Sequence, residues 1–288
     1  MEARSAEAGA GPIAPAWFDS HLHLNDSLFD DDREAVAHAM ARERIAGVCV
    51  GYDMPSSLAA IRLARRHRHL FAAVGIHPMA AGAAGQEALR QLKRWILEEP
   101  DVVGIGECGL DRSIPSVSKE EQRKALIRQL ELACTVQKPL ILHVRQAYGE
   151  MLEILSRYRE SLPALVLHGC SASPESIRQY LQLGAFVSVG SPVTWEGAVK
   201  PKKAAAAVPA DRLLIETDSP FSPPEGMRGQ RNTPMTIGIV GATVSGIRGA
   251  APEEIAGQTF RNACRAFGLP CEYGEDLFAK GQERTREG

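Results

Sequence analysis

The sequence lacks any run of about 18 apolar residues, which is the length that a membrane-spanning helix requires. It also lacks an excess of one charge, because 33 basic and 35 acidic residues leave a net charge of −2. A broad basic face for nucleic acid is therefore not expected. The first 15 residues have neither the basic start nor the apolar stretch of a secretory signal. The hydrophobic content of 44% excludes a chain that is disordered throughout.

Closely spaced cysteine pairs are also missing, since none of the six cysteines forms a CxxC motif. Most of them lie inside apolar runs, and their positions are Cys49, Cys108, Cys134, Cys170, Cys264 and Cys271. In a chain of 288 residues this pattern predicts reduced, buried thiols rather than a disulfide framework. We therefore predict a cytoplasmic protein.

Short apolar runs alternate with amphipathic segments, a pattern typical of a parallel sheet covered by helices. Strands are expected at Trp17–Phe18, Gly47–Val50, Leu70–Val74, Val102–Ile105, Leu140–Leu142, Leu165–Leu167, Phe186–Val189 and Leu213–Ile215. Helices are expected at Asp31–Arg44, Leu58–Arg68, Gln86–Glu98, Lys119–Gln137, Tyr148–Tyr158, Pro174–Leu183 and Pro252–Phe267. Eight such units in about 255 residues predict a single-domain (β/α)8 TIM barrel, although a doubly wound open sheet fits the alternation as well. We assign residues 1–15 to a flexible tail, 16–270 to the barrel and 271–288 to a polar tail.

Polar side chains follow the predicted strands, at the end of the barrel where active sites lie. Five of the eight histidines occupy these strand ends, namely His21, His23, His77, His143 and His168. Glu107 follows the fourth strand among glycines, and Asp218 follows the eighth. Taken singly, each residue has an ordinary explanation, such as a core histidine or a turn-capping carboxylate. Their concentration at one end of the barrel predicts a shared site.

Six of these side chains are candidate metal ligands, enough for two divalent ions, and they are His21, His23, Glu107, His143, His168 and Asp218. His21 and His23 are two residues apart, so their rings project to the same side of an extended strand. Glu107 is the natural bridge, because one carboxylate offers two oxygens. Asp218 can orient or deprotonate a bound water, so Glu107 and Asp218 are the predicted catalytic residues. The mixed donors suit Mg²⁺, Mn²⁺ or Zn²⁺.

The ordered set of motifs from Phe18 to Phe267 resembles the TatD family of metal-dependent hydrolases, within the amidohydrolase-like TIM barrels. The motifs are Asp19-Ser20-His21-Leu22-His23, Gly75-Ile76-His77-Pro78, Gly106-Glu107-Cys108-Gly109-Leu110-Asp111, His143-Val144-Arg145, His168, Glu216-Thr217-Asp218-Ser219-Pro220-Phe221 and Arg228-Gly229-Gln230-Arg231-Asn232. The resemblance implies a two-metal site and DNase activity, often as a 3′ exonuclease. It also implies that His21, His23, Glu107 and Asp218 hold one ion, and that Glu107, His143 and His168 hold the other.

Three positions depart from the usual pattern of that family. Gln146 stands where an acidic residue is usual, Gly169-Cys170 replaces Cys-Phe, and Arg112 replaces an aromatic residue. None of them is a predicted ligand, so they bear on the choice of substrate more than on metal binding.

Candidate contacts to substrate phosphate are His77, Arg112, Arg145, Arg228 and Arg231, because guanidinium groups match phosphate oxygens bidentately. Arg228 and Arg231 could equally belong to a solvated loop, and the His77-Pro78 pair could be structural. Trp195 and Phe221 could stack on a base, with core or rim packing as the more ordinary role.

The leading hypothesis is a metal-dependent phosphodiesterase that acts on DNA ends. A second hypothesis keeps the hydrolysis but changes the bond to an ester or amide, as in a misacylated tRNA or a cyclic amide. A third is a non-catalytic, metal-stabilised partner in a larger assembly. The sequence makes no prediction of the oligomeric state.

Overall fold

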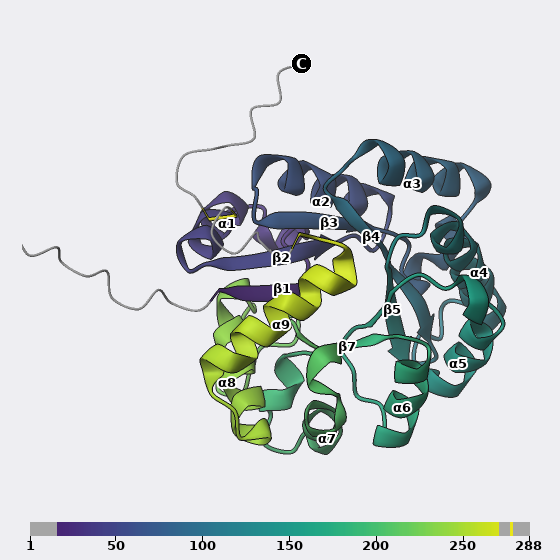
Figure 1. Ribbon diagram of the computed structural model, residues 1–288. Coiled ribbons are helices and arrows are strands. Elements are labelled where there is room, and N and C mark those ends of the chain that lie inside the picture. Colours follow the sequence, from purple (N-terminus) through teal and green to yellow (C-terminus); the bar gives the residue numbers. More distant parts are fainter. Residues whose placement is uncertain (1–15, 271–276, 279–288) are drawn as a thin grey trace, which may run out of the picture.

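Eight parallel strands form one sheet in chain order in the computed structural model, which describes residues 16–270 and 277–278 (Figure 1). The strands are β1 (Trp17–Leu22), β2 (Ile45–Val50), β3 (Leu70–Val74), β4 (Val102–Asp111), β5 (Leu140–Arg145), β6 (Leu165–Leu167), β7 (Phe186–Val189) and β8 (Leu213–Ile215). With helices between them, they form a single-domain TIM barrel, which confirms the predicted fold. The predicted tail 1–15 and most of the segment 271–288 lie outside the described residues.

The helices are α1 (Arg33–Arg42), α2 (Met54–Arg66), α3 (Gln86–Glu98), α4 (Lys119–Val136), α5 (Tyr148–Ser156), α6 (Pro174–Gln182), α7 (Val199–Ala207), α8 (Ile237–Arg248) and α9 (Pro252–Phe267). Helices α7 and α8 were not predicted. Helix α7 lacks apolar residues at the three-and-four spacing, and α8 contains three glycines, which have low helix propensity. Packing explains the glycine at position 241, because a Cβ there would lie 2.3 Å from the Trp17 ring. Among the described residues, no helix has the length and apolar character needed to cross a membrane.

An apolar plug closes the amino-terminal end of the barrel. Inward-facing strand residues such as Phe18, Phe71 and Ile141 pack there against Phe260 and Phe267 of α9. Figure 1 shows α9 (yellow) crossing the front of the barrel over β1. Leu277 and Phe278 belong to the same cluster, so these two residues of the predicted polar tail contact the plug.

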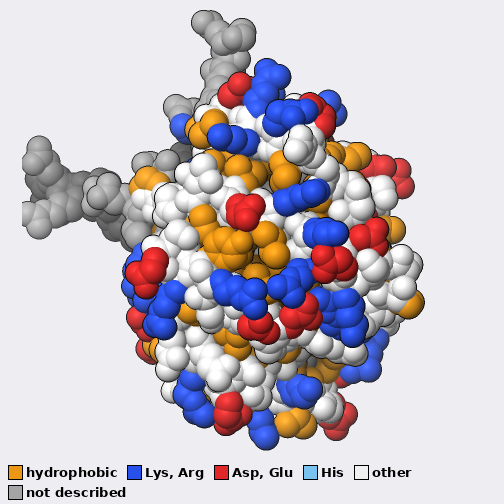
Figure 2. Space-filling model, turned by 90° about the vertical axis from the view of Figure 1, so that its right-hand side faces the viewer, with side chains coloured by type: hydrophobic (Ala, Val, Ile, Leu, Met, Phe, Trp, Pro, Cys, Tyr) orange, Lys and Arg blue, Asp and Glu red, His pale blue; other side chains and the backbone are white. Residues whose placement is uncertain are grey.

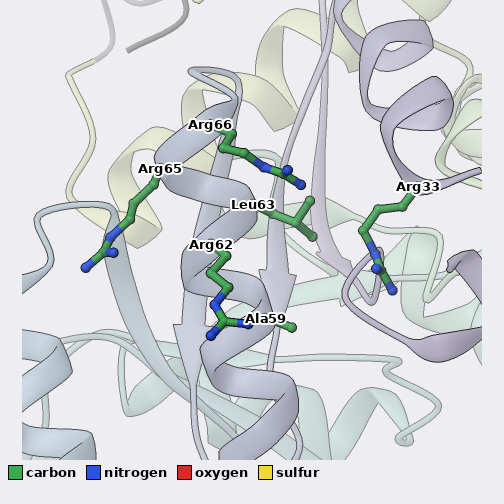
Figure 3. A pocket seen from close by; sticks show the side chains of 6 residues that line it. All are labelled: Arg33, Ala59, Arg62, Leu63, Arg65 and Arg66. Carbon is green, nitrogen blue, oxygen red and sulfur yellow. The ribbon is translucent and has the colours of Figure 1, made fainter. Parts of the chain in front are cut away.

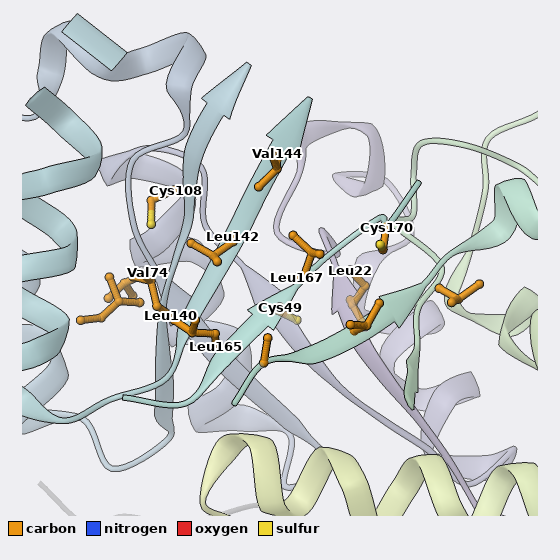
Figure 4. Packing of buried hydrophobic residues seen from close by; sticks show 14 of the residues in the cluster. Leu22, Cys49, Val74, Cys108, Leu140, Leu142, Val144, Leu165, Leu167 and Cys170 are labelled. Carbon is orange, nitrogen blue, oxygen red and sulfur yellow. The ribbon is translucent and has the colours of Figure 1, made fainter. Parts of the chain in front are cut away.

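A second core lies between the sheet and the surrounding helices, and alternation along the strands separates it from the barrel interior. On β5, Leu140, Leu142 and Val144 belong to this outer core (Figure 4). The intervening Ile141 belongs to the plug, and His143 follows it at the opposite end of the interior. The alternation of two therefore directs polar side chains into the carboxyl-terminal mouth of the barrel.

Side chains reinforce the seam between β8 and β1. The Ser20 hydroxyl donates to the Ile215 carbonyl at 3.0 Å, and the Asp19 carboxylate accepts from both N–H and hydroxyl of Thr217, at 3.0 and 2.5 Å. The Asp218 N–H then donates to the His21 carbonyl at 3.0 Å. These bonds fix the predicted ligands from the first and last strands next to each other.

Candidate metal centre

Glu107 lies within β4 rather than after it, because the strand continues through both neighbouring glycines to Asp111. Gly106 and Gly109 have φ values of 142° and 158°, and a Cβ on Gly109 would come 1.9 Å from the His143 carbonyl oxygen. Only glycine permits this approach of β4 to β5. The register of the two strands shifts between Ile105 and Cys108, around the Glu107 carboxylate.

The first donor group gathers around one oxygen of Glu107. Nε2 of His21 and Nε2 of His23 lie 3.1 Å apart, and they are 3.6 and 3.8 Å from Oε2 of Glu107. Oδ1 of Asp218 lies 3.9 and 3.5 Å from the same two nitrogens. An ion bound at about 2.1 Å brings its donors to roughly 3 to 3.5 Å from one another, so small adjustments let these four residues hold one ion.

The second donor group uses the other oxygen of Glu107. Oε1 lies 2.6 Å from Nδ1 of His143 and 3.0 Å from Nε2 of His168, and these two nitrogens are 3.3 Å apart. Two sets of donors therefore share one carboxylate, each through a different oxygen. This arrangement fits a pair of divalent ions bridged by Glu107.

The outward nitrogens of three histidines have partners that suit metal binding by the inward ones. Nδ1 of His23 is 2.8 Å from the Val50 carbonyl, and Nδ1 of His168 is 3.2 Å from Oε1 of Glu216. Nε2 of His143 is 3.2 Å from Oδ2 of Asp111. Because each partner accepts a hydrogen bond, the outward nitrogen can keep its proton while the inward nitrogen gives up its own proton to bind an ion.

Two of these partners, Asp111 and Glu216, were not singled out as site residues from the sequence. Both belong to the quoted motifs, yet spacing alone does not say which histidine each one contacts. Glu216 is fully buried and also accepts from the Gly169 N–H at 2.6 Å. Asp111 is held by the Ser113 N–H at 2.8 Å.

The electrostatics keep the bridging carboxylate ionised. Burial opposes its charge, but positive His168 and hydrogen bonds from His143 and His168 hold the pKa of Glu107 well below its usual value. Burial likewise opposes the charge of Asp218, whose pKa is nevertheless lowered by a hydrogen bond from His23 and by nearby histidines. Asp218 has a left-handed backbone with φ of 56°, an uncommon conformation that often occurs at functional sites.

His77 lies beside the centre as a neutral hydrogen-bond donor. Its Nδ1 accepts the Met79 N–H at 3.0 Å, which assigns the proton to Nε2, 3.8 Å from Oε1 of Glu107. Burial is the main cause that lowers the pKa of His77, to about 4. His77, Glu107 and His143 also have donor atoms within 4.8 Å of one another.

Three of the four predicted arginine contacts are engaged by carboxylates of the protein itself. Arg112 binds Glu150 at 2.9 and 2.5 Å, and Arg231 binds Asp32 at 2.8 and 2.6 Å. Arg228 pairs with Glu225 at 3.1 Å and stacks over the Trp195 ring, 5.1 Å from its centroid. Arg145 is exposed, and within the described part of the chain its guanidinium has no ion-pair partner.

Arginines also gather on the outside of the barrel, but most of them pair with acidic residues there. A concavity of about 450 Å³ on the outside of α1 and α2 is lined by Arg33, Ala59, Arg62, Leu63, Arg65 and Arg66 (Figure 3). Ion pairs with Asp30, Glu34 and Glu99 neutralise three of its four arginines. Basic and acidic side chains also intermingle on the face shown in Figure 2. The mouth of the barrel is therefore the better candidate for a functional site.

Comparison with known proteins agrees with this centre. The model of the family described as TatD related DNase matches residues 18–268. The chain belongs to that family. The "uncharacterized metal-dependent hydrolase YabD" of Bacillus subtilis is 35% identical over 251 residues, which are 87% of this chain and 98% of that protein. The "3'-5' ssDNA/RNA exonuclease TatD" of Klebsiella pneumoniae is 32% identical over 261 residues, which are 88% of this chain and 98% of that protein.

The same family relation is found among solved structures. The crystal structure of the TatD homologue YJJV from Escherichia coli K12 superposes with a TM-score of 0.83 at 30% identity, covering 88% of this chain and 98% of that one. Membership in the TatD family confirms the resemblance inferred from the motifs, and the amidohydrolase-like fold agrees with the barrel. The histidine and glutamate clusters are consistent with a binuclear metal site in a metal-dependent hydrolase.

Proposed function

We propose that this TatD-family hydrolase is a two-metal phosphodiesterase that removes nucleotides from single-stranded DNA ends in the 3′-to-5′ direction. The observation that carries the proposal is the sharing of Glu107, with Oε2 facing His21 and His23 and Oε1 facing His143 and His168. The name of the Klebsiella relative supports the direction and the substrate. Free cysteines at positions 49, 108, 134 and 170 of the described part of the chain support a cytoplasmic location for the enzyme.

In this proposal the six predicted ligands hold two Mg²⁺, Mn²⁺ or Zn²⁺ ions. When bound, such ions activate water as a nucleophile and neutralise the oxygens of a phosphodiester. Both oxygens of Glu107 face histidines, so this carboxylate would serve as the ligand that the two ions share rather than as a proton acceptor.

Asp218 is the residue suited to accept a proton. Its Oδ1 faces the histidines, whereas Oδ2 receives only a long hydrogen bond from the Ser222 hydroxyl, at 3.3 Å. Its side chain is 23% exposed, so water can reach it from the mouth. The attacking water gives its proton to Asp218 while its oxygen bonds to phosphorus. The bond from phosphorus to the sugar oxygen breaks, and that oxygen takes a proton from solvent and leaves as a hydroxyl group. Nε2 of His77 can donate a hydrogen bond to a phosphate oxygen from the side.

The test uses single-stranded DNA labelled at either end, with Mg²⁺, Mn²⁺ or Zn²⁺ supplied separately. Asp218→Asn should lower turnover by about 10²- to 10⁴-fold, as expected for loss of a general base. Asp211→Asn is the matched control, because Asp211 is 61% exposed and lies outside the mouth. Absence of turnover with all three metals, or equal turnover by Asp218→Asn, would refute the proposal. Hydrolysis of an ester or amide panel without DNA cleavage would favour the second hypothesis instead.

A further inference from the structure

Three exposed apolar side chains lie in segments on the mouth side of the barrel. Six large hydrophobic residues are prominently exposed among those described, and three of them lie in the segments that follow strands β1, β3 and β8. These three are Leu28, Met79 and Phe221, with exposed fractions of 56%, 62% and 44%. Phe221 is the aromatic member, and it is three residues beyond Asp218 in the chain. Exposed apolar surface beside a polar centre is typical of a ligand-binding site, where the ligand covers the apolar groups.

The Phe221 ring borders the metal centre directly. Its centroid lies 5.7 Å from that of His23, and the two ring planes meet at 65°. His23 in turn places Nε2 at 3.5 Å from Oδ1 of Asp218. A T-shaped contact occupies only an edge or one face of each ring, so the contact with His23 leaves a face of Phe221 available.

Hydrogen bonds hold Phe221 in place although its side chain is exposed. Its N–H donates to the Asp218 carbonyl at 2.9 Å, and its carbonyl accepts from Nδ2 of Asn232 at 2.9 Å. Asn232 is fully buried and also donates to the Thr217 carbonyl at 2.9 Å. Pro223 lies in the same loop as Phe221, and its carbonyl accepts a hydrogen bond from the Trp195 indole at 2.9 Å. Because the backbone of Phe221 is fixed in this way, only the ring has to be ordered when a flat ligand stacks on it.

We propose that Phe221 is a stacking platform for an unpaired nucleobase adjacent to the phosphodiester held at the metal centre. Every base has a π-face, and a phenyl ring offers no hydrogen-bonding group, so the platform accepts all four bases. A paired base is covered by its neighbours in the duplex, so the platform favours single strands and frayed ends. This inference rests on the proposed nuclease function and adds to it the residue that binds the base.

Steady-state kinetics with matched single-stranded substrates, with and without an abasic nucleotide, test the platform. Wild type and Phe221→Ala, →Leu and →Trp act on single-stranded DNA with a normal end, or with an abasic nucleotide at the terminal or penultimate position. Leu97→Ala on α3, where Leu97 is 67% exposed, is the control for loss of exposed apolar surface. Phe221→Ala should raise KM for normal DNA roughly 5- to 150-fold, with a much smaller change in kcat. Phe221→Leu should behave like the alanine variant, and Phe221→Trp should resemble wild type.

The abasic substrates distinguish stacking from a structural effect. Wild type should lose affinity for one of the two abasic substrates, whereas Phe221→Ala should treat that substrate and normal DNA alike. The ratio of KM for abasic DNA to KM for normal DNA is the deciding quantity. If this ratio is the same in wild type and Phe221→Ala for both abasic positions, the platform is overturned. So would a wild-type KM for Phe221→Leu, which would indicate simple apolar contact.

Fluorescence of 2-aminopurine gives a second readout that needs no turnover. In the Asp218→Asn background with metal present, binding should quench a 2-aminopurine placed beside the end, and adding Phe221→Ala should abolish that quenching. DNA cleavage by wild type with no effect of Phe221→Ala in either assay would overturn the platform alone. Failure of the wild-type protein to bind or cleave DNA would overturn both the platform and the nuclease proposal.

Discussion

Replacement of Glu216 by glutamine tests how the centre holds its metal. Glu216 is fully buried, and its Oε1 accepts from the Gly169 N–H at 2.6 Å and faces Nδ1 of His168 at 3.2 Å. Glu216→Gln keeps the size of the side chain and an acceptor for Gly169. It removes the negative charge that holds a proton on Nδ1 of His168 when Nε2 gives up its own proton to bind an ion.

The size of the effect follows from the bond that changes. A hydrogen bond to a charged group contributes about 1.5 to 3 kcal/mol, of which the neutral amide retains only a part. Loss of such a partner behind a metal-binding histidine typically weakens metal binding 10- to 100-fold, or about 1.4 to 2.7 kcal/mol. We expect that loss for the ion held by His143 and His168, and a smaller one for the ion held by His21 and His23.

Competition with a chromogenic chelator measures the affinity for each Zn²⁺ ion, and circular dichroism checks that the metal-free variant is folded. Glu225→Gln is the matched control, because Glu225 is exposed and its carboxylate pairs at the surface with Arg228 and with the Glu196 N–H. Unchanged affinity for both ions in Glu216→Gln would refute the argument that Glu216 positions His168. An equal loss in Glu225→Gln would attribute the effect to net charge instead.

Two further predictions concern stability. The pKa of buried His69 is lowered to about 4, chiefly by burial, from 6.5. The unfolded chain therefore binds a proton at His69 that the folded one does not, and this residue alone lowers the free energy of unfolding by about 2 kcal/mol between pH 7 and 5. In urea titrations of metal-free protein, the loss of stability between pH 7 and 5 should be about 2 kcal/mol smaller in His69→Phe than in wild type, and equal losses in both proteins would contradict the argument. Phe267→Ala, in the plug and stacked 6.1 Å from Phe18, should cost about 3 to 5 kcal/mol, against less than about 0.5 for exposed Leu97→Ala. If thermal melts give Phe267→Ala and Leu97→Ala similar melting temperatures, the plug is loosely packed.

The positions of all eight strands could be predicted from the sequence, because each carries a short apolar run between turn signals. The end of β4 could not, since Gly106 and Gly109 suggest a turn after Ile105. In the structure the strand continues to Asp111, and the register shift beside Glu107 absorbs the irregular glycines. Helices α7 and α8 were missed because tertiary packing, rather than local periodicity, stabilises them.

Within the site, the strand ends indicated which side chains share the mouth, but they did not indicate their partners. The support of His143 by Asp111 and of His168 by Glu216 depends on which ring nitrogen faces inward, and this is decided by the fold. The pairing of Arg231 with Asp32 likewise joins loops that are 199 residues apart in the chain. Charge counts and motifs contain no signal for such pairs.

The engaged arginines lead to a prediction about how DNA binds. Arg112, Arg228 and Arg231 each have a carboxylate partner, and Arg145 is exposed with none in the described region. Protein contacts should therefore neutralise only one or two phosphates, which predicts a shallow log–log salt dependence with a slope of roughly −0.7 to −1.4 on single strands. Titration of metal-loaded Asp218→Asn with fluorescent DNA at increasing KCl measures that slope, and adding Arg145→Ala should make it shallower by about 0.7. A slope steeper than about −3 would instead require an extended basic track, which contradicts recognition of an end by the metal centre and one arginine.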